Sequence, residues 1–434
     1  MTKTGVGILG FGTVGAGVAE GLLRNRETLA QRLGVEVELR KIADLDTERD
    51  RGVKLPEGML VRDAAEVIAD PDISIVVELI GGTKTAADFI LRAIAAGKHV
   101  VTANKALLAE RGAEIFEAAG KAGVDVYFGA SVGGGIPIVR VLREGLAGNE
   151  IERIDGILNG TCNYILTRMG KERIPFDAAL ADAQCKGYAE ADPSLDIDGW
   201  DTAHKAILLA SLAYGFYVPK AEVDVTGIRR LSSTDVQYAD RLGYCVKLLA
   251  RIERDGDEVE VDVGPALVPA GHMLASVSGV FNAVMVHGDL VDDMLLYGRG
   301  AGRAPTASTV IGDIGDVARN IAGGSPRYRN AISTANAGHL RVKPRGEVRS
   351  EFYIRLMVKD APGTFGCFGT IFGKHGVSIR TASSFPFVPG SEILETIPVV
   401  IETHPARRAD LEAALAEIKR SGVVRCEPVA MRIV

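Results

Sequence analysis

The first 130 residues alternate between short runs that are apolar throughout and longer segments whose apolar residues recur at helical spacing. The apolar runs predict buried strands at Val6–Leu9, Val37–Ala43, Ile73–Ile80, His99–Thr102 and Val124–Phe128. Helical spacing separates several of them, at Val14–Leu23, Ala86–Ala96 and Lys105–Ala119. Strands without a polar face, separated by helices, predict a doubly wound α/β domain with a parallel sheet, which we place at residues 1–135.

Residues 136–304 mix longer helical segments with alternating polar and apolar positions, which predicts a second α/β domain of mixed topology. The elements expected there are Ile151–Leu158, Tyr164–Met169, Phe176–Cys185, Thr202–Tyr214, Glu258–Val263 and Asn282–His287. A glycine-rich turn then leads into a helical pattern at Thr309–Ile321. We expect a helix within residues 305–325 to complete the first domain.

The C-terminal part of the chain separates into a polar stretch, predicted as a linker at 326–349, and a small unit at 350–434. Its expected order is strand Glu351–Val358, helix Thr364–His375, strands Ser378–Ser384 and Glu395–Glu402, helix Arg407–Ser421 and strand Val423–Val434. This βαββαβ order is that of a ferredoxin-like domain.

Composition narrows the classes of function. With 434 residues, 47% hydrophobic and 24% charged, the chain has the make-up of a soluble globular protein. A net charge of -6 and interleaved bases argue against nucleic-acid or anionic-membrane partners. Five cysteines without CxxC spacing and seven scattered histidines argue against disulfides and a zinc site. Because the N-terminus lacks the features of a signal peptide and no apolar run reaches ~18 residues, we expect a cytoplasmic protein.

The segment GILGFGTVG places Gly10, Gly12 and Gly15 in a GxGxxG pattern between the first strand and the first helix. Gly10 permits a tight turn, Gly12 lets the backbone approach a pyrophosphate, and Gly15 allows close packing of helix on strand. In this context the pattern predicts a Rossmann-type nucleotide site at the helix N-terminus.

Asp44 ends the second strand, where a carboxylate would bind the ribose 2′-hydroxyl of NAD and disfavour the 2′-phosphate of NADP. It lies further from the glycines than usual, which the segment 24–34 can explain by lengthening the first crossover. Four bases in the same region could instead neutralise a phosphate or simply be solvated: Lys41, Arg49, Arg51 and Lys54. The choice between NAD and NADP stays open, with a slight preference for NAD.

Further polar positions follow the next two strands. Gly81 and Thr83 come after one strand, and Thr102 ends another just before Lys105. The carboxyl ends of parallel strands meet at the edge where ligands bind in this class of fold, so these residues are candidate cofactor contacts. Lys105 would face the nicotinamide side, unless it is only a surface lysine at the start of a helix.

The stretch DPSLDIDGWDTAHK, residues 192–205, holds four aspartates within ten residues. Its spacing fails as a calcium loop, because Ile197 stands where glycine is needed and Ala203 where the last ligand is needed. Helix capping explains one or two of the acids but not all of them. Asp201 and Lys205 lie one helical turn apart, either as an ion pair or lining a cleft where the lysine transfers a proton. The remaining acids would suit a substrate with a free α-amino group.

The run AQCKGYAEADPSLDIDGWDTAHK resembles the signature of the homoserine dehydrogenases, long form with a C-terminal ACT domain. GFGTVG, ELIGGT, KHVVTANKALLA, SVGGGIPI, LNGTCNYIL and GAGRAPTAS also resemble segments of that family, so the resemblance extends over nearly the whole chain. It implies NAD(P)-dependent interconversion of L-homoserine and L-aspartate 4-semialdehyde. Rivals are a dehydrogenase of another amino acid and a non-catalytic amino-acid sensor.

The resemblance also implies roles for individual residues. Lys205 would be the proton donor and acceptor, Lys105 catalytic or in contact with the cofactor, and Glu190 and Asp201 the substrate contacts. Of the acids that shape or cap the loop, Asp196 is the one we expect to assist directly in substrate binding. The remaining implied cofactor contacts are Phe11, Thr13, Val14, Gly187 and Gly302. A structural sodium ion would be held by main-chain carbonyls of Gly129, Val132, Gly134 and Ile136. Family members usually have glutamate where Gly129 stands, a change that leaves the main-chain carbonyl in place.

In the tail, VKDAPGTFGCFGTIFGKHGVSI looks like an ACT domain, whose turn at 360–363 resembles an amino-acid-binding position. The resemblance implies threonine as a feedback inhibitor, or else an ACT domain used only for oligomerisation. It also leads us to expect a homodimer or homotetramer.

Overall fold

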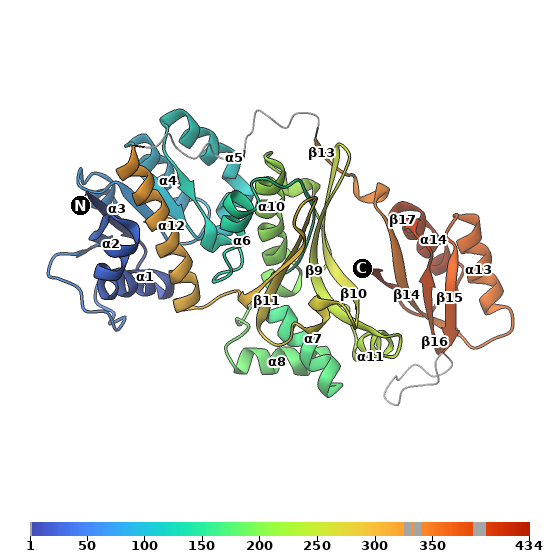
Figure 1. Cartoon of the computed structure of the whole chain (residues 1–434). Coiled ribbons are helices and arrows are strands. Elements are labelled where there is room, and N and C mark those ends of the chain that lie inside the picture. Colours follow the sequence, from blue (N-terminus) through green and yellow to red (C-terminus); the bar gives the residue numbers. More distant parts are fainter. Residues whose placement is uncertain (1, 325–331, 333–339, 385–395) are drawn as a thin grey trace. The chain divides into compact units, whose positions relative to one another are not determined.

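The computed structural model describes residues 2–324, 332, 340–384 and 396–434 (Figure 1). The chain divides into two compact units, each assembled from separate segments. The first comprises Met1–Ile154, His204–Val223 and Asn282–Leu340, and the second Asp155–Ala203, Asp224–Phe281 and Arg341–Val434. Within the described part of the chain, no helix is both long and apolar enough to cross a membrane.

The first unit contains a six-stranded sheet in the order β3-β2-β1-β4-β5-β6, in which all neighbouring strands run parallel. Its strands are β1 (Lys3–Leu9), β2 (Glu36–Ala43), β3 (Leu60–Val61), β4 (Ile75–Glu78), β5 (His99–Thr102) and β6 (Val126–Tyr127). The strand order reverses between β1 and β4, which defines the switch point where doubly wound sheets bind ligands. The doubly wound parallel sheet predicted from the periodicity is therefore present.

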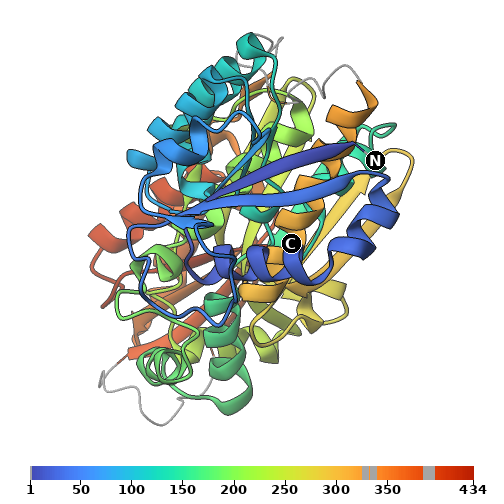
Figure 2. The ribbon, with the colours of Figure 1, turned by 90° about the vertical axis from the view of Figure 1, so that its left-hand side faces the viewer.

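The helices of this unit include one from far along the chain. They are α1 (Thr13–Arg24), α2 (Arg26–Leu33), α3 (Ala64–Ile68), α4 (Thr85–Ala95), α5 (Lys105–Ala122) and α12 (Arg303–Gly323). Val310, Ile314 and Val317 of α12 are fully buried in the same core as Val18 of α1 and Ile8 of β1. Figure 2 shows α12, in orange, beside the blue helix α1.

Shorter elements complete the first unit. They are η1 (Gly129–Ser131), α6 (Ile138–Arg140), a π-helical turn η2 (Val141–Gly145), most of α10 (Trp200–Tyr214), η3 (Lys220–Glu222) and the strands β11 (Phe281–Gly288) and β12 (Asp292–Arg299). Strand β7 (Ile151–Ile157) continues from this unit into the second.

The second unit is built around a long antiparallel hairpin, β9 (Tyr244–Asp255) and β10 (Glu258–Pro269), paired along its whole length. Its other elements before the tail are α7 (Gly160–Glu172), α8 (Phe176–Cys185), α9 (Ser194–Ile197), β8 (Asp224–Val225), α11 (Ser233–Arg241) and η4 (Met273–Ser276). The short strand β8 pairs with β10.

The C-terminal tail has the order β14 (Arg349–Lys359), α13 (Thr364–Lys374), β15 (Ile379–Ser384), β16 (Thr396–Thr403), β17 (Ala406–Arg407), α14 (Arg408–Arg420) and β18 (Val429–Ile433). The four main strands are ordered β18-β14-β16-β15, with antiparallel neighbours. Helices α13 and α14 pack against this sheet through Phe368, Phe372 and Leu411 (Figure 1).

The sequence pattern predicted that the tail is a separate small unit. In the structure the tail belongs to the second unit and pairs with its hairpin. Strand β18 pairs in parallel with β10, through Ala266 with Arg432 and Leu267 with Ile433, so its sheet continues the hairpin sheet. In the segment predicted as a linker, β13 (Arg341–Val342) also pairs with β10, and η5 (Arg345–Glu347) precedes β14. Residues 326–331, 333–339 and the predicted strand start Glu395 lie outside the described residues. Strand-edge hydrogen bonds and paired charges join these segments, and neither produces a sequence period.

Candidate active site

The glycine turn after β1 has the geometry that its residue types predict. Gly10 has a φ of 98°, and a β-carbon there would lie 2.7 Å from the Leu79 carbonyl oxygen. A β-carbon on Gly15 would lie 2.0 Å from the Gly10 carbonyl oxygen, whereas one on Gly12 would meet nothing within 4 Å. Gly12 is also the N-cap of α1, with Thr13 and Val14 in its first turn. Backbone at this helix start is therefore open to an anionic ligand.

Asp44, at the end of β2, faces this turn. Its carboxylate accepts hydrogen bonds from the Phe11 amide at 2.6 Å and the Asp46 amide at 2.9 Å. The Arg51 guanidinium lies 3.4 Å from the same carboxylate and 5.3 Å from the centroid of the Phe11 ring. Among the neighbouring bases, Lys41 instead forms an ion pair with Asp70 at 3.4 Å. The acid expected to disfavour a 2′-phosphate is thus partly neutralised by Arg51.

The turns after β4 and β5 lie at the carboxyl edge of the sheet. Gly81 and Gly82 have φ values of 75° and 72°, and a β-carbon on either would meet nothing within 4 Å. The Asn104 side chain donates to the Gly82 carbonyl at 2.8 Å and accepts from the Leu107 amide at 3.1 Å, which caps α5. Lys105 is the first residue of that helix, and Thr102 is the last residue of β5.

The segment 129–136 packs beside α12 and is buried except at Gly135. The Gly129 amide donates to the Asp313 carboxylate at 2.8 Å, and burial raises the pKa of Asp313 to about 7. The Gly134 carbonyl accepts from the Thr309 hydroxyl at 2.6 Å, and the Ile136 carbonyl accepts from the Ile138 amide at 2.8 Å. A β-carbon on Gly134 would lie 2.4 Å from the Gly300 carbonyl oxygen, so the glycines before Gly302, the N-cap of α12, pack directly on this segment.

In the second unit, Asn159 joins two of the four aspartates. This residue is 5% exposed, and its carbonyl oxygen accepts from the Cys162 amide at 2.8 Å, which caps α7. Its amide nitrogen donates to Asp196 Oδ1 at 2.7 Å and to Asp201 Oδ2 at 2.8 Å. The two carboxylates therefore accept hydrogen bonds from the same side-chain amide, although they are five positions apart in the sequence. The spacing of the acids does not indicate that Asn159 belongs to this site. The only signal for it in the sequence is its position in the segment LNGTCNYIL.

The other two aspartates have structural partners. The Asp192 carboxylate accepts from the Ser194 amide at 3.1 Å, and hydrogen bonding from Ser194 lowers the pKa of Asp192. Asp198 accepts two hydrogen bonds from Arg229, at 2.9 and 3.0 Å. Glu190 is exposed, and Gly187 has a φ of 72° at the end of α8. The acidic stretch thus divides into two acids that shape the loop and two that share Asn159.

Asp201 and Lys205 both belong to α10 and both are buried, with 6% and 8% of their surface exposed. One helical turn separates them, so they lie on the same face of that helix, as the spacing predicts. Buried aspartate and lysine are uncommon in proteins unless they are paired or functional. This placement makes the start of α10 the strongest candidate for acid–base chemistry in the described residues.

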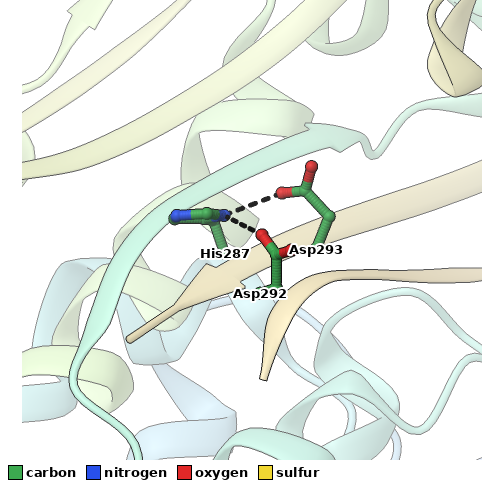
Figure 3. Close-up of side chains that lie close together, drawn as sticks. All are labelled: His287, Asp292 and Asp293. Atoms are coloured by element: carbon green, nitrogen blue, oxygen red, sulfur yellow. Dashed lines mark hydrogen bonds and ion pairs between the residues drawn. The ribbon is translucent and has the colours of Figure 1, made fainter. Parts of the chain in front are cut away.

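A second charged group lies on the β11–β12 hairpin. The ligand atoms of His287, Asp292 and Asp293 lie within 4.8 Å of one another (Figure 3). His287 Nδ1 lies 2.9 Å from Asp293 and 3.5 Å from Asp292, while its Nε2 faces Glu152 at 3.5 Å. The side chains of Asp292 and Asp293 are 88% and 50% exposed, which favours a solvated ion-pair network over a metal site.

Two family models match the chain. One, described as "Homoserine dehydrogenase, NAD binding domain", matches residues 10–129, and the other, "Homoserine dehydrogenase", matches residues 137–314. Both matched ranges end before the C-terminal tail.

Individual relatives are similar over a longer range. A homoserine dehydrogenase of Synechocystis sp. is 42% identical over 99% of both chains. The crystal structure of a homoserine dehydrogenase from Thiobacillus denitrificans has a TM-score of 0.92 at 39% identity, covering 100% of this chain and 99% of that one. A hyperthermophilic archaeal homoserine dehydrogenase solved with NADPH has a TM-score of 0.62 at 28% identity, covering 75% of this chain and 99% of that one.

Proposed function

The chain belongs to the homoserine dehydrogenase family of NAD(P)-dependent oxidoreductases, and from that premise we propose how its site works. We propose that it interconverts L-homoserine and L-aspartate 4-semialdehyde, as a step toward threonine, isoleucine and methionine. In the oxidation, the C4–H bond breaks with its electron pair leaving as hydride, and the hydroxyl proton passes to a base. The observation that supports this most directly is the pair of carboxylates bound to Asn159, one of which, Asp201, lies on the helix that contains Lys205.

Asp196 and Asp201 suit the α-ammonium group of an amino-acid substrate. Two carboxylates on one amide repel each other unless a cation lies between them. A substrate ammonium supplies that charge and three donors, so hydrogen bonds to both acids would also orient the carbon chain. Glu190, in the exposed loop before α9, is the third proposed contact. Selectivity for an amino alcohol would follow from this geometry.

Lys205 is the proposed proton donor and acceptor for the substrate oxygen. Its buried place one turn after Asp201 would bring its ammonium group close to the same substrate that the acids hold. Lys105, at the start of α5, is the proposed second lysine, acting on the substrate oxygen or the cofactor. General acid–base help of this kind contributes about 10²- to 10⁴-fold in rate.

A bound NAD or NADP would supply the hydride acceptor at the carboxyl edge of the parallel sheet. The residues proposed to contact it are Gly10, Phe11, Gly12, Thr13, Val14, Gly15, Asp44, Gly81, Thr83, Thr102, Lys105, Gly187 and Gly302. The open backbone at Gly12 supports this assignment. The pairing of Arg51 with Asp44 supports acceptance of NADP as well as NAD, as does the archaeal relative solved with NADPH.

The carbonyl oxygens of Gly129, Val132, Gly134 and Ile136 are proposed to hold a sodium ion. Main-chain carbonyls suit a hard cation, and each has two lone pairs, so the hydrogen bonds at Gly134 and Ile136 leave a position for the ion. A β-carbon on Gly129 would lie 2.9 Å from an Asp313 oxygen, so a glutamate here would require Asp313 to move. Glycine therefore fits this segment, and its carbonyl, which accepts from the Val132 amide at 3.4 Å, keeps a second lone pair for the ion.

We further propose that the tail is a ferredoxin-like ACT domain that senses threonine. Its βαββαβ order and its β18-β14-β16-β15 strand order support that domain type. Its contacts within the second unit suggest a route to the substrate residues. Arg408 lies 2.7 Å from Asp224 and 3.0 Å from Asp262, and Arg345 also pairs with Asp224.

The route continues through the chain after Asp224. The Thr226 amide donates to the Val263 carbonyl at 2.7 Å, and the Ile228 amide donates to the Ile197 carbonyl at 2.8 Å. Gly227 packs on this loop, where a β-carbon would lie 2.3 Å from the Ile197 oxygen. Ile197 directly follows Asp196, so a displacement of β8 by the tail would also move Asp196, a proposed substrate-binding residue.

The remaining proposals are a homodimeric or homotetrameric assembly and a cytoplasmic location, both by analogy with the family. One experiment tests the central proposal: homoserine oxidation with NAD and NADP in parallel, with and without threonine. Appearance of the reduced nicotinamide at 340 nm with homoserine, and not with other amino alcohols, is the expected result. No oxidation of homoserine with either cofactor would overturn the proposal.

A further inference from the structure

Glu78 is a completely buried carboxyl group at the end of the central strand β4. In the sheet it pairs with Leu9 of β1 on one side and with Thr102 of β5 on the other. It therefore lies at the strand-order switch point, on the edge where a dinucleotide is expected. Glu78 is not among the proposed substrate, cofactor or sodium ligands, so none of those roles explains why a carboxyl group is buried at this position.

The carboxylate joins the turns that follow β4 and β5. Oε1 accepts hydrogen bonds from the Ile80 amide at 2.9 Å and the Gly81 amide at 3.2 Å. Oε2 accepts from the Thr102 hydroxyl at 2.7 Å, and that hydroxyl accepts from the Asn104 amide at 3.0 Å. The Asn104 side chain donates to the Gly82 carbonyl, which links the two turns a second time. It also caps α5, the helix that begins at Lys105.

The third turn, after β1, packs on the same group of atoms. Gly10 is so close to Leu79 and Ile80 that a β-carbon would overlap them, and the Leu79 amide donates to the Leu9 carbonyl at 2.8 Å. The Glu78 side chain thus links the Ile80–Gly82 turn to the start of α5, whereas the glycine turn packs on Leu79 and Ile80 without a hydrogen bond to that carboxylate.

The choice of a carboxylate has a physical reason. Burial raises the pKa of Glu78, whereas hydrogen bonds from the Thr102 hydroxyl and the Ile80 and Gly81 amides lower it. Both oxygens serve as acceptors, which a carboxylate can do and an amide cannot. Glutamine at this position would either point its NH₂ group at two backbone donors or reverse the bond to the Thr102 hydroxyl, which would then have to accept instead of donate.

We propose that Glu78 is a positioning residue for hydride transfer, because it holds the Ile80–Gly82 turn and the Lys105 helix start where the nicotinamide end of the dinucleotide must lie. The inference rests on the proposed dehydrogenase function. It predicts that loss of the carboxylate displaces the reacting end of the cofactor while the adenosine end, bound at the glycine turn, is held nearly as before.

The test compares Glu78→Gln with a control at Lys98, which directly precedes β5 and contacts the segment before β4. Lys98 is 6% exposed, and its ammonium donates to the Ile73 carbonyl at 2.6 Å and the Asp70 carbonyl at 2.7 Å, near the amino end of β4. Lys98→Met should therefore lower the melting temperature without touching the ligand edge. Each full-length variant is measured for Tm, ADP-ribose affinity, kcat, KM and the deuterium isotope effect with homoserine labelled at C4.

For Glu78→Gln we expect kcat to fall about 100-fold, since misplacement by an ångström costs that much. The isotope effect on kcat should rise as hydride transfer becomes rate-limiting, while ADP-ribose affinity and the KM for homoserine stay within about twofold. Lys98→Met should leave kcat and the isotope effect at the wild-type values. If Glu78→Gln does not fold, Thr102→Val, which removes one donor to the carboxylate, is expected to show the same pattern more weakly.

Two results would overturn the positioning role in an active wild-type enzyme. The first is a folded Glu78→Gln variant whose kcat and isotope effect equal those of the wild type. If Glu78→Gln does not fold, the same result for Thr102→Val would overturn the role. The other is a fall in kcat matched by an equal loss of ADP-ribose affinity, because that pattern describes a general structural defect. A wild-type protein that cannot oxidise homoserine would instead contradict the proposed function, so the two failures are distinguishable.

Discussion

Replacing Asp224 with asparagine should change how the stability of the second unit depends on pH. Asp224 begins β8, and its side chain is 8% exposed. It faces the Asp262 carboxyl of β10, the Arg408 guanidinium of α14 and the Arg345 guanidinium of η5. Burial, and then the charge of Asp262, raise the pKa of Asp224 from 3.8 to about 6, against the opposing effect of the two arginines.

The sign follows from proton linkage. Between pH 3.8 and about 6 the folded protein keeps a proton on Asp224 that the unfolded chain has released. Its contribution to stability is therefore complete below pH 3.8 and is lost as the pH rises through 6. At about 1.4 kcal/mol for each pH unit, the loss amounts to at most about 3 kcal/mol. Asparagine cannot ionise, so this part of the pH dependence should be absent from Asp224→Asn.

The assay is urea unfolding between pH 4 and 7.5, followed by the fluorescence of Trp200, the one tryptophan in the chain. Any constant cost of weakening the two arginine contacts cancels when the difference between variant and wild type is plotted against pH. That difference should shift in favour of the variant by up to about 3 kcal/mol from pH 4 to 7.

The matched control is Asp255→Asn, at the end of β9 in the same unit. Hydrogen bonding and charge from Lys343 lower the pKa of this exposed carboxyl, so any slope should be small and opposite in sign. Parallel pH profiles for wild type and Asp224→Asn would refute the reasoning, because they would mean that Asp224 ionises equally easily in the folded and unfolded chain.

Further predictions concern the site. Lys205→Ala should lower kcat about 10²- to 10⁴-fold with unchanged dinucleotide affinity in a binding titration, and near-normal turnover would exclude it as the acid–base group. Asn159→Ala should raise the KM for homoserine about tenfold, since two carboxylates lose a shared donor worth about 1.5 kcal/mol, whereas an unchanged KM would separate those acids from the amine. Arg51→Ala should raise the KM for NADP more than that for NAD in parallel assays; equal changes would exclude it from 2′-phosphate recognition. Arg408→Gln should weaken threonine inhibition without changing the uninhibited kcat, and an unaltered inhibition curve would contradict the route through β8.

Local patterns were sufficient for much of the fold. The parallel sheet was predictable because strands buried on both faces are apolar throughout, and β5 has the bounds that the apolar run indicated. Short elements were missed because they lack a long enough period: α2 lies in the lengthened crossover, and β3 has two residues. The first crossover is longer than usual because it contains a second helix.

The candidate site was only partly predictable. The glycine pattern and the i, i+4 spacing of Asp201 and Lys205 are local, and the structure has the turn and the helix that they imply. Asn159 could not be placed beside Asp196 and Asp201 by spacing, since it is more than 35 residues away in the sequence. Glu78 could not be identified for a different reason: the sequence does not show whether a glutamate at the end of a strand faces solvent or the turns that follow β4 and β5.

By itself, the sequence determined the elements whose cause is local: the periodic strands and helices, the glycines at obligatory turns, and the charges in the acidic stretch. Tertiary structure alone decided which of those charges act together. Asp192 and Asp198 are engaged by Ser194 and Arg229, and only Asp196 and Asp201 meet on Asn159. It also decided that β18 would extend the β9–β10 sheet. The physical reason is that hydrogen bonds and ion pairs between distant segments depend on where the folded backbone brings each side chain, and no local period records that position.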